Sequence, residues 1–154
     1  MTASHLIAKS VAYFQRIQKI TALLFLIAGG ISFLFSEQIL GYCISSVLAG
    51  FSLFLYYQAH EGESPVLDTL KHKPKSIVWV YHHCLVSMPF GVKTFERTTL
   101  YIYTLDKQYH TQLIKNDSAE KLLVTLEKEL PQATFGFSVE KEQLYRANPA
   151  MLLR

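Results

Sequence analysis

Apolar residues are gathered at one end of the chain. Residues 20–35 and residues 39–57 form runs of sixteen and nineteen residues without a charged side chain, and only residues 36–38 separate them. A helix rises about 1.5 Å per residue and the hydrocarbon core of a bilayer is about 30 Å thick, so the second run can cross unaided and the first needs about one more turn. The pattern predicts a transmembrane helical hairpin over residues 20–57, with spans over about 17–35 and 39–57.

Two other interpretations of these runs are weaker. A buried hairpin in a soluble protein would need enough chain to surround two helices that are apolar on every side, and residues 76–154 are too few, whereas lipid surrounds them without help. A cleaved signal peptide would end in a small-x-small cleavage site, which the first run lacks, and a second apolar run would not follow it almost at once.

Residues 1–19 carry apolar side chains at helical spacing before the first run. Polar residues lie elsewhere around the same helix. The apolar positions are Leu6, Ile7, Val11, Phe14 and Ile17. This pattern predicts an amphipathic helix over residues 1–19. Such a helix either lies on the membrane surface or continues the first span and docks on the C-terminal domain.

Small side chains mark where the two predicted spans can approach closely. They are Gly29 and Gly30 in the first span, and Gly41, Ser45 and Ala49 at four-residue spacing in the second. Close packing of helices in lipid depends on such residues. No acidic, basic or amide side chain lies in either run, so packing is favoured over a transport pathway. The small residues of the second span serve either this hairpin contact or an intermolecular one, in self-association or in docking on a larger membrane complex.

A polar linker is predicted over residues 58–75, and it ends in three lysines, Lys71, Lys73 and Lys75. A lysine near a membrane surface contributes about 1 kcal/mol toward anionic lipid. These charges therefore either contact anionic lipid or only fix the topology, and the second interpretation is the simpler one. Because cations precede the first span, follow the second and are absent from the turn, both termini are expected to be cytoplasmic.

From residue 76 the chain becomes rich in β-branched and aromatic residues. Strands are predicted over residues 77–87, 98–105 and 108–114, with a tight turn between the last two. Two helices follow: Asp117, with Glu120 three residues on, predicts the capped start of the first, and Ser138 predicts the cap of the second. The order β-β-β-α-α predicts a small cytosolic α+β domain, an antiparallel sheet covered on one face by helices.

Several short motifs of residues 76–154 carry a resemblance. They are Trp79-Val80-Tyr81, Met88-Pro89-Phe90-Gly91, Thr134-Phe135-Gly136-Phe137 and Tyr145-Arg146-Ala147-Asn148-Pro149. In these motifs the chain resembles small, uncharacterised bacterial membrane proteins with two spans and a cytosolic β-rich domain, and it is distantly similar to bacterial pleckstrin-homology-like domains. The resemblance implies a protein of the bacterial inner membrane that acts as a binding or scaffold module. It implies no catalytic activity.

Charge restricts the class of partner. The net charge of +3 is the sum of +2 in residues 1–60 (three cations, one anion), 0 in residues 61–75 (three and three) and +1 in residues 76–154 (nine and eight). No segment is a polycation, so a nucleic-acid partner is not expected. Half of all residues are hydrophobic and 18% are charged, which excludes a disordered chain.

One group of side chains has the chemistry of metal ligands: His82, His83, Cys84 and, on a neighbouring predicted strand, His110. Imidazole and thiolate ligate zinc or copper. Successive side chains of a strand point to opposite faces, so His82 and Cys84 share one face and His83 lies on the other. The chain also has no C-x-x-C or H-E-x-x-H motif. We therefore expect neither a metal nor another cofactor.

Catalysis has no better support. As a nucleophile Cys84 would need a base and an orienting acid, and the nearest acid in the sequence is Glu96. We expect an integral membrane protein whose cytosolic domain is a protein- or lipid-binding scaffold module, and not an enzyme. The alternative is a membrane-tethered enzyme or metal-binding protein that uses the four residues His82, His83, Cys84 and His110.

Overall fold

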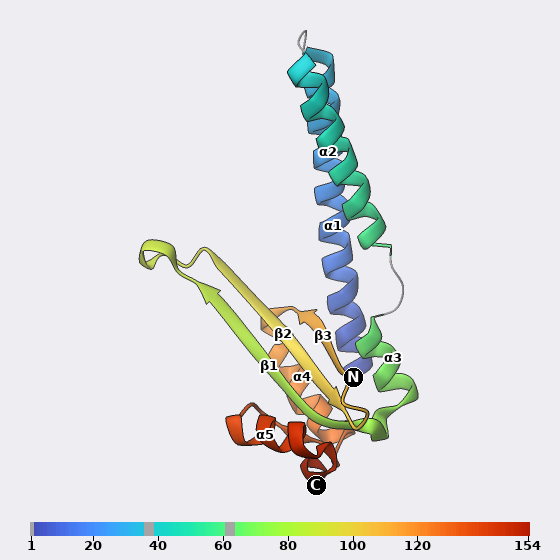
Figure 1. The fold of residues 1–154 in the computed structure, drawn as a ribbon, viewed down its shortest axis with the longest axis vertical. Coiled ribbons are helices and arrows are strands. Elements are labelled where there is room, and N and C mark those ends of the chain that lie inside the picture. Colours follow the sequence, from blue (N-terminus) through green and yellow to red (C-terminus); the bar gives the residue numbers. More distant parts are fainter. Residues whose placement is uncertain (1, 36–38, 61–63) are drawn as a thin grey trace. The chain divides into compact units, whose positions relative to one another are not determined.

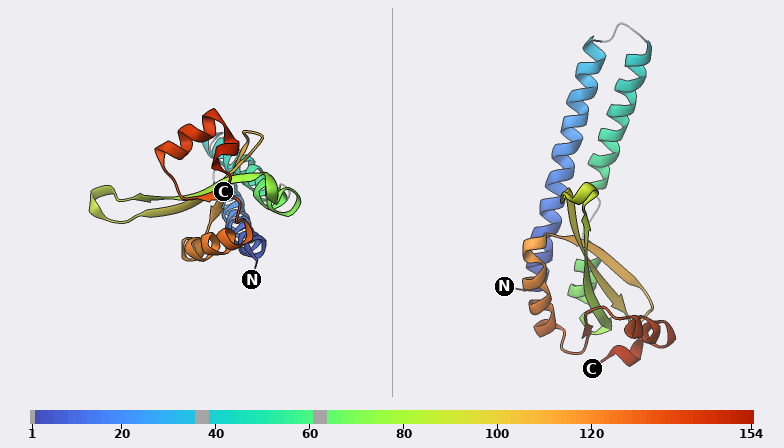
Figure 2. Two further views of the ribbon diagram at one scale, coloured as in Figure 1. Left: turned by 90° about the horizontal axis from the view of Figure 1, so that it is seen from below. Right: turned by 90° about the vertical axis from the view of Figure 1, so that its left-hand side faces the viewer.

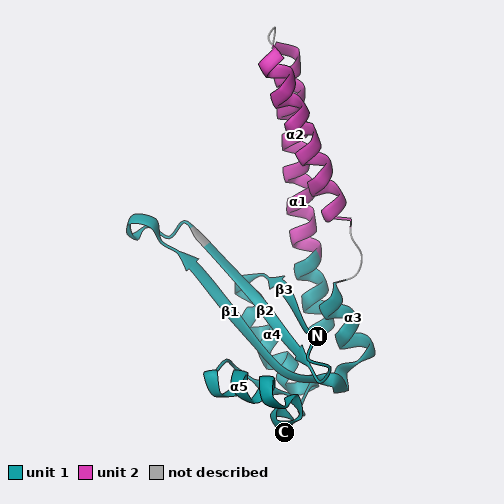
Figure 3. Ribbon diagram, in the orientation of Figure 1, with its two compact units in different colours: residues 1–11, 63–154 teal, residues 12–62 magenta. Residues whose placement is uncertain are grey.

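The computed structural model describes residues 2–35, 39–60 and 64–154, including only the backbone of Phe95. The chain forms two compact units: Met1–Val11 with Glu63–Arg154, and Ala12–Gly62 (Figure 3). We call the first the sheet domain and the second the helical hairpin. The turn predicted at residues 36–38 lies outside the described residues.

Two long helices make up most of the N-terminal part of the chain, α1 (Ala3–Phe35) and α2 (Ile39–Gln58) (Figure 1). Both are long enough and apolar enough to cross a membrane. The residues of the predicted amphipathic helix and those of the first apolar run form one unbroken helix, α1. Of the two arrangements that the sequence left open, the structure therefore has the one in which the N-terminal helix continues the first span.

The first turns of α1 belong to the sheet domain. Ala3 and Ile7 are completely buried in its main core, and the backbone N–H of Ala3 donates a hydrogen bond to a carboxylate oxygen of Glu129 at 2.9 Å. The helix thus enters the domain with its apolar side inward, as the spacing of Leu6 and Ile7 requires.

Three strands form the body of the sheet: β1 (Ile77–Ser87), β2 (Phe95–Thr104) and β3 (Tyr109–Ile114). They pair antiparallel in chain order, with Val80 opposite Ile102 and Ile102 opposite His110. Helix α4 (Asn116–Glu129) then leads to β4 (Thr134–Phe135), which pairs parallel with Trp79 and Val80 at the other edge of β1. The described sheet therefore has the order β3-β2-β1-β4.

Helices cover both faces of this sheet (Figure 2). On one face, α4, the first turns of α1 and the short helix α3 (Pro65–His72) bury the main core. That core includes Val66, Ile77, Val80, Leu100, Ile102, Leu122 and Leu126. On the other face, α5 (Val139–Ala147) and the 3-10 turn η3 (Pro149–Leu152) bury a second cluster of Val78, Trp79, Tyr145 and Leu152.

Parts of the predicted order were wrong. The domain has the order β-β-β-α-β-α rather than β-β-β-α-α, its sheet is mixed rather than antiparallel, and α5 lies on the face opposite α4. The parallel strand β4 has only two residues, too few for the alternation of side chains that marks a strand. Its pairing is set instead by the buried segment that follows α4, where Leu130 and Ala133 enter the main core.

Two local predictions also differ from the structure, and one is confirmed. The predicted linker contains α3, whose Val66 and Leu67 are buried. Asp117 lies inside the first turn of α4, whose N-cap position is Lys115 without a side-chain cap, so the predicted capping box was wrong. Ser138 does cap α5, because its hydroxyl accepts a hydrogen bond from the backbone N–H of Lys141 at 3.2 Å.

Candidate functional site

Gly29 lies where α1 and α2 touch within the helical hairpin. A Cβ at Gly29 would meet the Cβ of Leu48 and the carbonyl oxygen of Ser45, each at 3.3 Å, whereas a Cβ at Gly30 would meet nothing within 4 Å. Ser45 is buried, and its hydroxyl donates to the Gly41 carbonyl at 2.8 Å. The structure therefore brings Gly29 together with Ser45 and Ala49, and it leaves Gly30 on the open side of α1.

A serine that sequence reasoning missed completes this contact. The buried hydroxyl of Ser52 donates to the carbonyl oxygen of Ala22 across the two helices at 2.7 Å. Ala22 is itself buried, which permits the approach. The signal in the sequence was one more small polar side chain, three residues beyond Ala49 in the same apolar run.

His82, His83, Cys84 and His110 do not form one site. His82 and Cys84 pair laterally with Leu100 and Thr98, which belong to the face of the main core, while His83 pairs with Thr99 on the other face. His110 lies two strands away, beside Ile102. Within the part of the chain that the structure describes, no three His, Cys, Asp or Glu side chains come together to hold a metal ion.

The three lysines of the predicted lipid contact are exposed around the end of α3. Lys71 is in the last turn of α3, Lys73 is its C-cap residue, and Lys75 lies in the following 3-10 turn, η1 (Pro74–Ser76). They are on a folded surface of the sheet domain and not on an extended connector.

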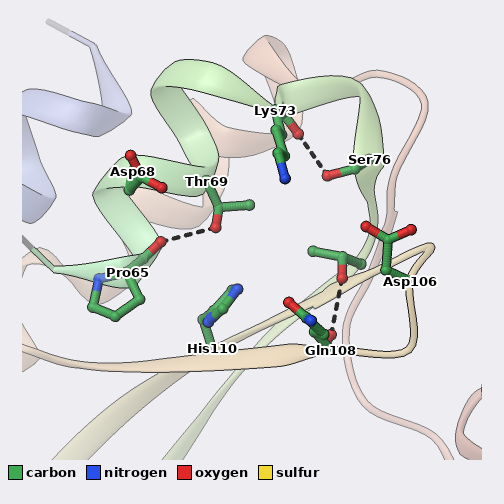
Figure 4. A pocket seen from close by; sticks show the side chains of 9 residues that line it. Pro65, Asp68, Thr69, Lys73, Ser76, Asp106, Gln108 and His110 are labelled. Carbon is green, nitrogen blue, oxygen red and sulfur yellow. Dashed lines mark hydrogen bonds between the residues drawn. The ribbon is translucent and has the colours of Figure 1, made fainter.

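A polar pocket of about 150 Å³ opens beside Lys73 (Figure 4). It is lined by Pro65, Asp68, Thr69, Lys73, Ser76, Thr104, Asp106, Gln108 and His110. The hydroxyls of Thr69, Ser76 and Thr104 donate to backbone carbonyls of Pro65, Lys73 and Gln108. Most of the lining thus holds the fold together, and the pocket has room for a few water molecules.

Aromatic side chains gather on the sheet face that α5 covers in part. We call this surface the aromatic face, made of Tyr81, Tyr101, Tyr103, Tyr109 and Phe137. Tyr81 stacks on Tyr101 with ring centroids 4.9 Å apart and an interplanar angle of 11°. Phe137 and Tyr109 remain 56% and 62% exposed, so the face is open at both sides.

Buried groups hold the aromatic face in place. The indole of Trp79, fully buried beneath Tyr81 and Tyr103, donates to the carbonyl oxygen of Gly136 at 2.9 Å. The φ of Gly136 is +81°, a conformation that residues with a Cβ rarely adopt. The ammonium group of Lys141 donates to the same carbonyl at 3.2 Å, which fixes the turn that presents Phe137.

Tyr81 of this face is neutral at physiological pH. Burial and a hydrogen bond with the Tyr103 hydroxyl raise the pKa of Tyr81 above its usual range, and the two hydroxyl oxygens are 3.2 Å apart. Burial likewise raises the pKa of Tyr145, whose hydroxyl donates to the carbonyls of Thr104 and Gln108. The aromatic face is therefore apolar with a few hydroxyl groups, a chemistry suited to contact with another protein surface.

The outer half of the β1–β2 hairpin projects from the sheet domain (Figures 1 and 2). The described pairing of β4 reaches only Val80 on β1, and that of β3 reaches only Thr98 on β2. Residues 82–97, which we call the arm, therefore continue largely as a two-stranded ribbon. Its exposed apolar side chains are Leu85, Val86, Met88, Phe90 and Val92.

No family model, curated protein or solved structure matches the chain. The fold agrees with the sequence resemblance at a coarse level, as two helices apolar enough to span a membrane followed by a small sheet domain.

Proposed function

We propose that this chain is a two-span protein of a bacterial inner membrane, with both termini in the cytoplasm, and that its sheet domain binds a protein partner through the aromatic face. The observation that supports binding is that Tyr109 and Phe137 are more than half exposed beside a stacked row of tyrosines. Aromatic residues are enriched at the centres of protein interfaces, where large rigid rings lose little entropy on contact.

Exposed apolar residues of the helical hairpin support the membrane part of this proposal. Leu34 is 78% exposed and Val47 is 70% exposed, and such residues extend along both helices. Water does not favour two long helices that are apolar on every side, whereas lipid does.

The core of the sheet domain supports a common side for the two termini. Ala3 and Ile7 precede the helical hairpin, Val66 and Leu126 follow it, and all four are buried in one core. The two ends of the chain must then lie on the same side of a membrane, which two crossings satisfy. The excess of cations on the flanks of the hairpin favours the cytoplasmic side.

Site-specific photocrosslinking tests the aromatic face. A benzophenone amino acid placed at Tyr109 in the full chain, expressed in its membrane, should form one discrete protein adduct. The control position is Val124, which is 55% exposed on α4, behind the opposite face of the sheet. Adding Tyr101→Ser should remove the adduct, whereas Thr111→Ser, at the position paired with Tyr101, should leave it.

Two results would count against this surface. The same adducts from positions 109 and 124 would indicate non-specific proximity. An adduct at position 109 that survives Tyr101→Ser unchanged would show that the row of tyrosines does not make the contact.

A further inference from the structure

The tip of the arm exposes a bulky apolar residue in an unfavourable backbone conformation. The side chain of Phe90 is as exposed as in an extended chain (104%), and its φ of +56° and ψ of 27° lie in the left-handed region. Residues with a Cβ rarely adopt this region, and such outliers often occur at functional sites. Phe90 is therefore held outward although two features of this arrangement are unfavourable: its apolar ring is exposed to water, and its backbone is in the left-handed region.

Apolar side chains surround the arm on both faces. Leu85 and Val86 are neighbours on β1, so they point to opposite faces, and both are exposed. Met88 and Val92 flank Phe90 at the tip and are also exposed. A two-stranded ribbon of this kind is marginally stable in water by itself. A partner that contacts all its sides would stabilise it.

We infer that the tip of the arm inserts into the interfacial region of a lipid bilayer. A protein groove would cover one side of the ribbon, whereas lipid surrounds Met88, Phe90 and Val92 on every side. The arm also carries the cations Lys93 and Arg97 against the single anion Glu96, a balance that suits anionic headgroups.

The inference rests on the proposed membrane anchoring, because the helical hairpin keeps lipid close to the sheet domain. Lys93 and Glu96 form an ion pair on the arm itself, which lowers the pKa of the Glu96 carboxyl and raises that of Lys93. The pair thus stays ionised near neutral pH and marks the level at which the arm leaves the apolar region for the headgroups.

Fluorescence quenching by lipid tests the insertion directly. The full chain, with Cys43→Ser and Cys84→Ser, is placed in nanodiscs of phosphatidylcholine and phosphatidylglycerol and labelled with the fluorophore NBD at a single cysteine. The substitutions are Phe90→Cys at the tip, Val47→Cys on α2 as the membrane reference, and Val124→Cys on α4 as the water reference. Lipids with a spin label near the headgroup end of the acyl chain should quench position 90 several-fold more than position 124.

A second set of variants separates insertion from an effect of the fluorophore. In the chain labelled at position 90, Met88→Ser with Val92→Ser should lower the quenching markedly. Thr94→Ser should leave it unchanged, because serine keeps the hydroxyl that donates to the Ser87 carbonyl. Equal quenching in both variants would overturn the inference.

The reference positions distinguish the possible failures. Quenching at position 47 with none at position 90 would overturn insertion of the arm and leave the membrane anchoring intact. No quenching at either position would overturn the anchoring and the insertion together. Shielding of position 90 that rises with protein concentration in detergent and does not respond to quencher lipid would show that a second copy covers the tip, and would also overturn the inference.

Discussion

Ile7→Ala measures how much the start of the chain contributes to the sheet domain. Ile7 is completely buried in the main core, although the helical hairpin separates it in sequence from every other residue of that buried core except Ala3. The change removes three carbon atoms, worth about 2.4 kcal/mol at about 0.8 kcal/mol per buried methylene, and a residual cavity adds to this. We expect a loss of about 3 kcal/mol from the free energy of unfolding. A domain of about a hundred residues has about 5–15 kcal/mol in total, so the loss is large.

The single tryptophan of the chain reports on this loss. Trp79 is fully buried in the sheet domain, so its fluorescence follows unfolding of that domain in urea, with the full chain in mild detergent. The control is Ile20→Ala, at a position of α1 that is 51% exposed in the helical hairpin, for which we expect less than about 1 kcal/mol. If Ile7→Ala lowers the stability no more than Ile20→Ala does, the first turns of α1 are not part of the core.

Two further predictions concern the helix contact and the tyrosines. Gly29→Leu should separate α1 from α2, because a Cβ at this position would already press on Leu48 and Ser45, whereas Gly30→Leu should leave the helices in contact. Energy transfer between labels on the two helices measures their separation. Equal effects of the two substitutions would refute the prediction. The raised pKa of Tyr81 means that the folded state keeps a proton that the unfolded state releases above about pH 10, so the free energy of unfolding should fall as the pH rises beyond that value. Tyr81→Phe should flatten this fall in urea titrations followed by Trp79 fluorescence, and an unchanged slope would contradict the assigned cause.

Periodicity explains which elements could be predicted from the sequence. The runs of β1, β2 and β3 are long and rich in β-branched and aromatic residues, and their positions agree with the prediction within a few residues. Helix α3 and strand β4 escaped prediction because eight and two residues are too short to show a clear period. Their places depend on contacts with residues distant in the sequence, such as the pairing of Phe135 with Val80.

The aromatic face was present in the sequence as an unused signal. Trp79 and Tyr81, and likewise Tyr101 and Tyr103, alternate with residues of the other face, which places all four on one side of a paired hairpin. What the sequence could not show is how much of that side α5 covers, since the direction in which a helix leaves β4 depends on the Gly136 turn and on Lys141. The group of His82, His83, Cys84 and His110, singled out for its chemistry, is by contrast divided between two strands and both faces of the sheet.

Because α1 is continuous, folding of the sheet domain depends on correct insertion of the helical hairpin. The N–H of Ala3 and the carboxylate of Glu129 that accepts its hydrogen bond are 126 positions apart, so the core cannot close until nearly the whole chain has been synthesised. Under the proposed topology, a chain with only one helix inserted would leave Ala3 and Ile7 across the bilayer from their partners. The main core would then stay open, with apolar residues accessible to chaperones and proteases. The main core thus closes only when both helices are correctly inserted, and chaperones and proteases distinguish the closed domain from the open one.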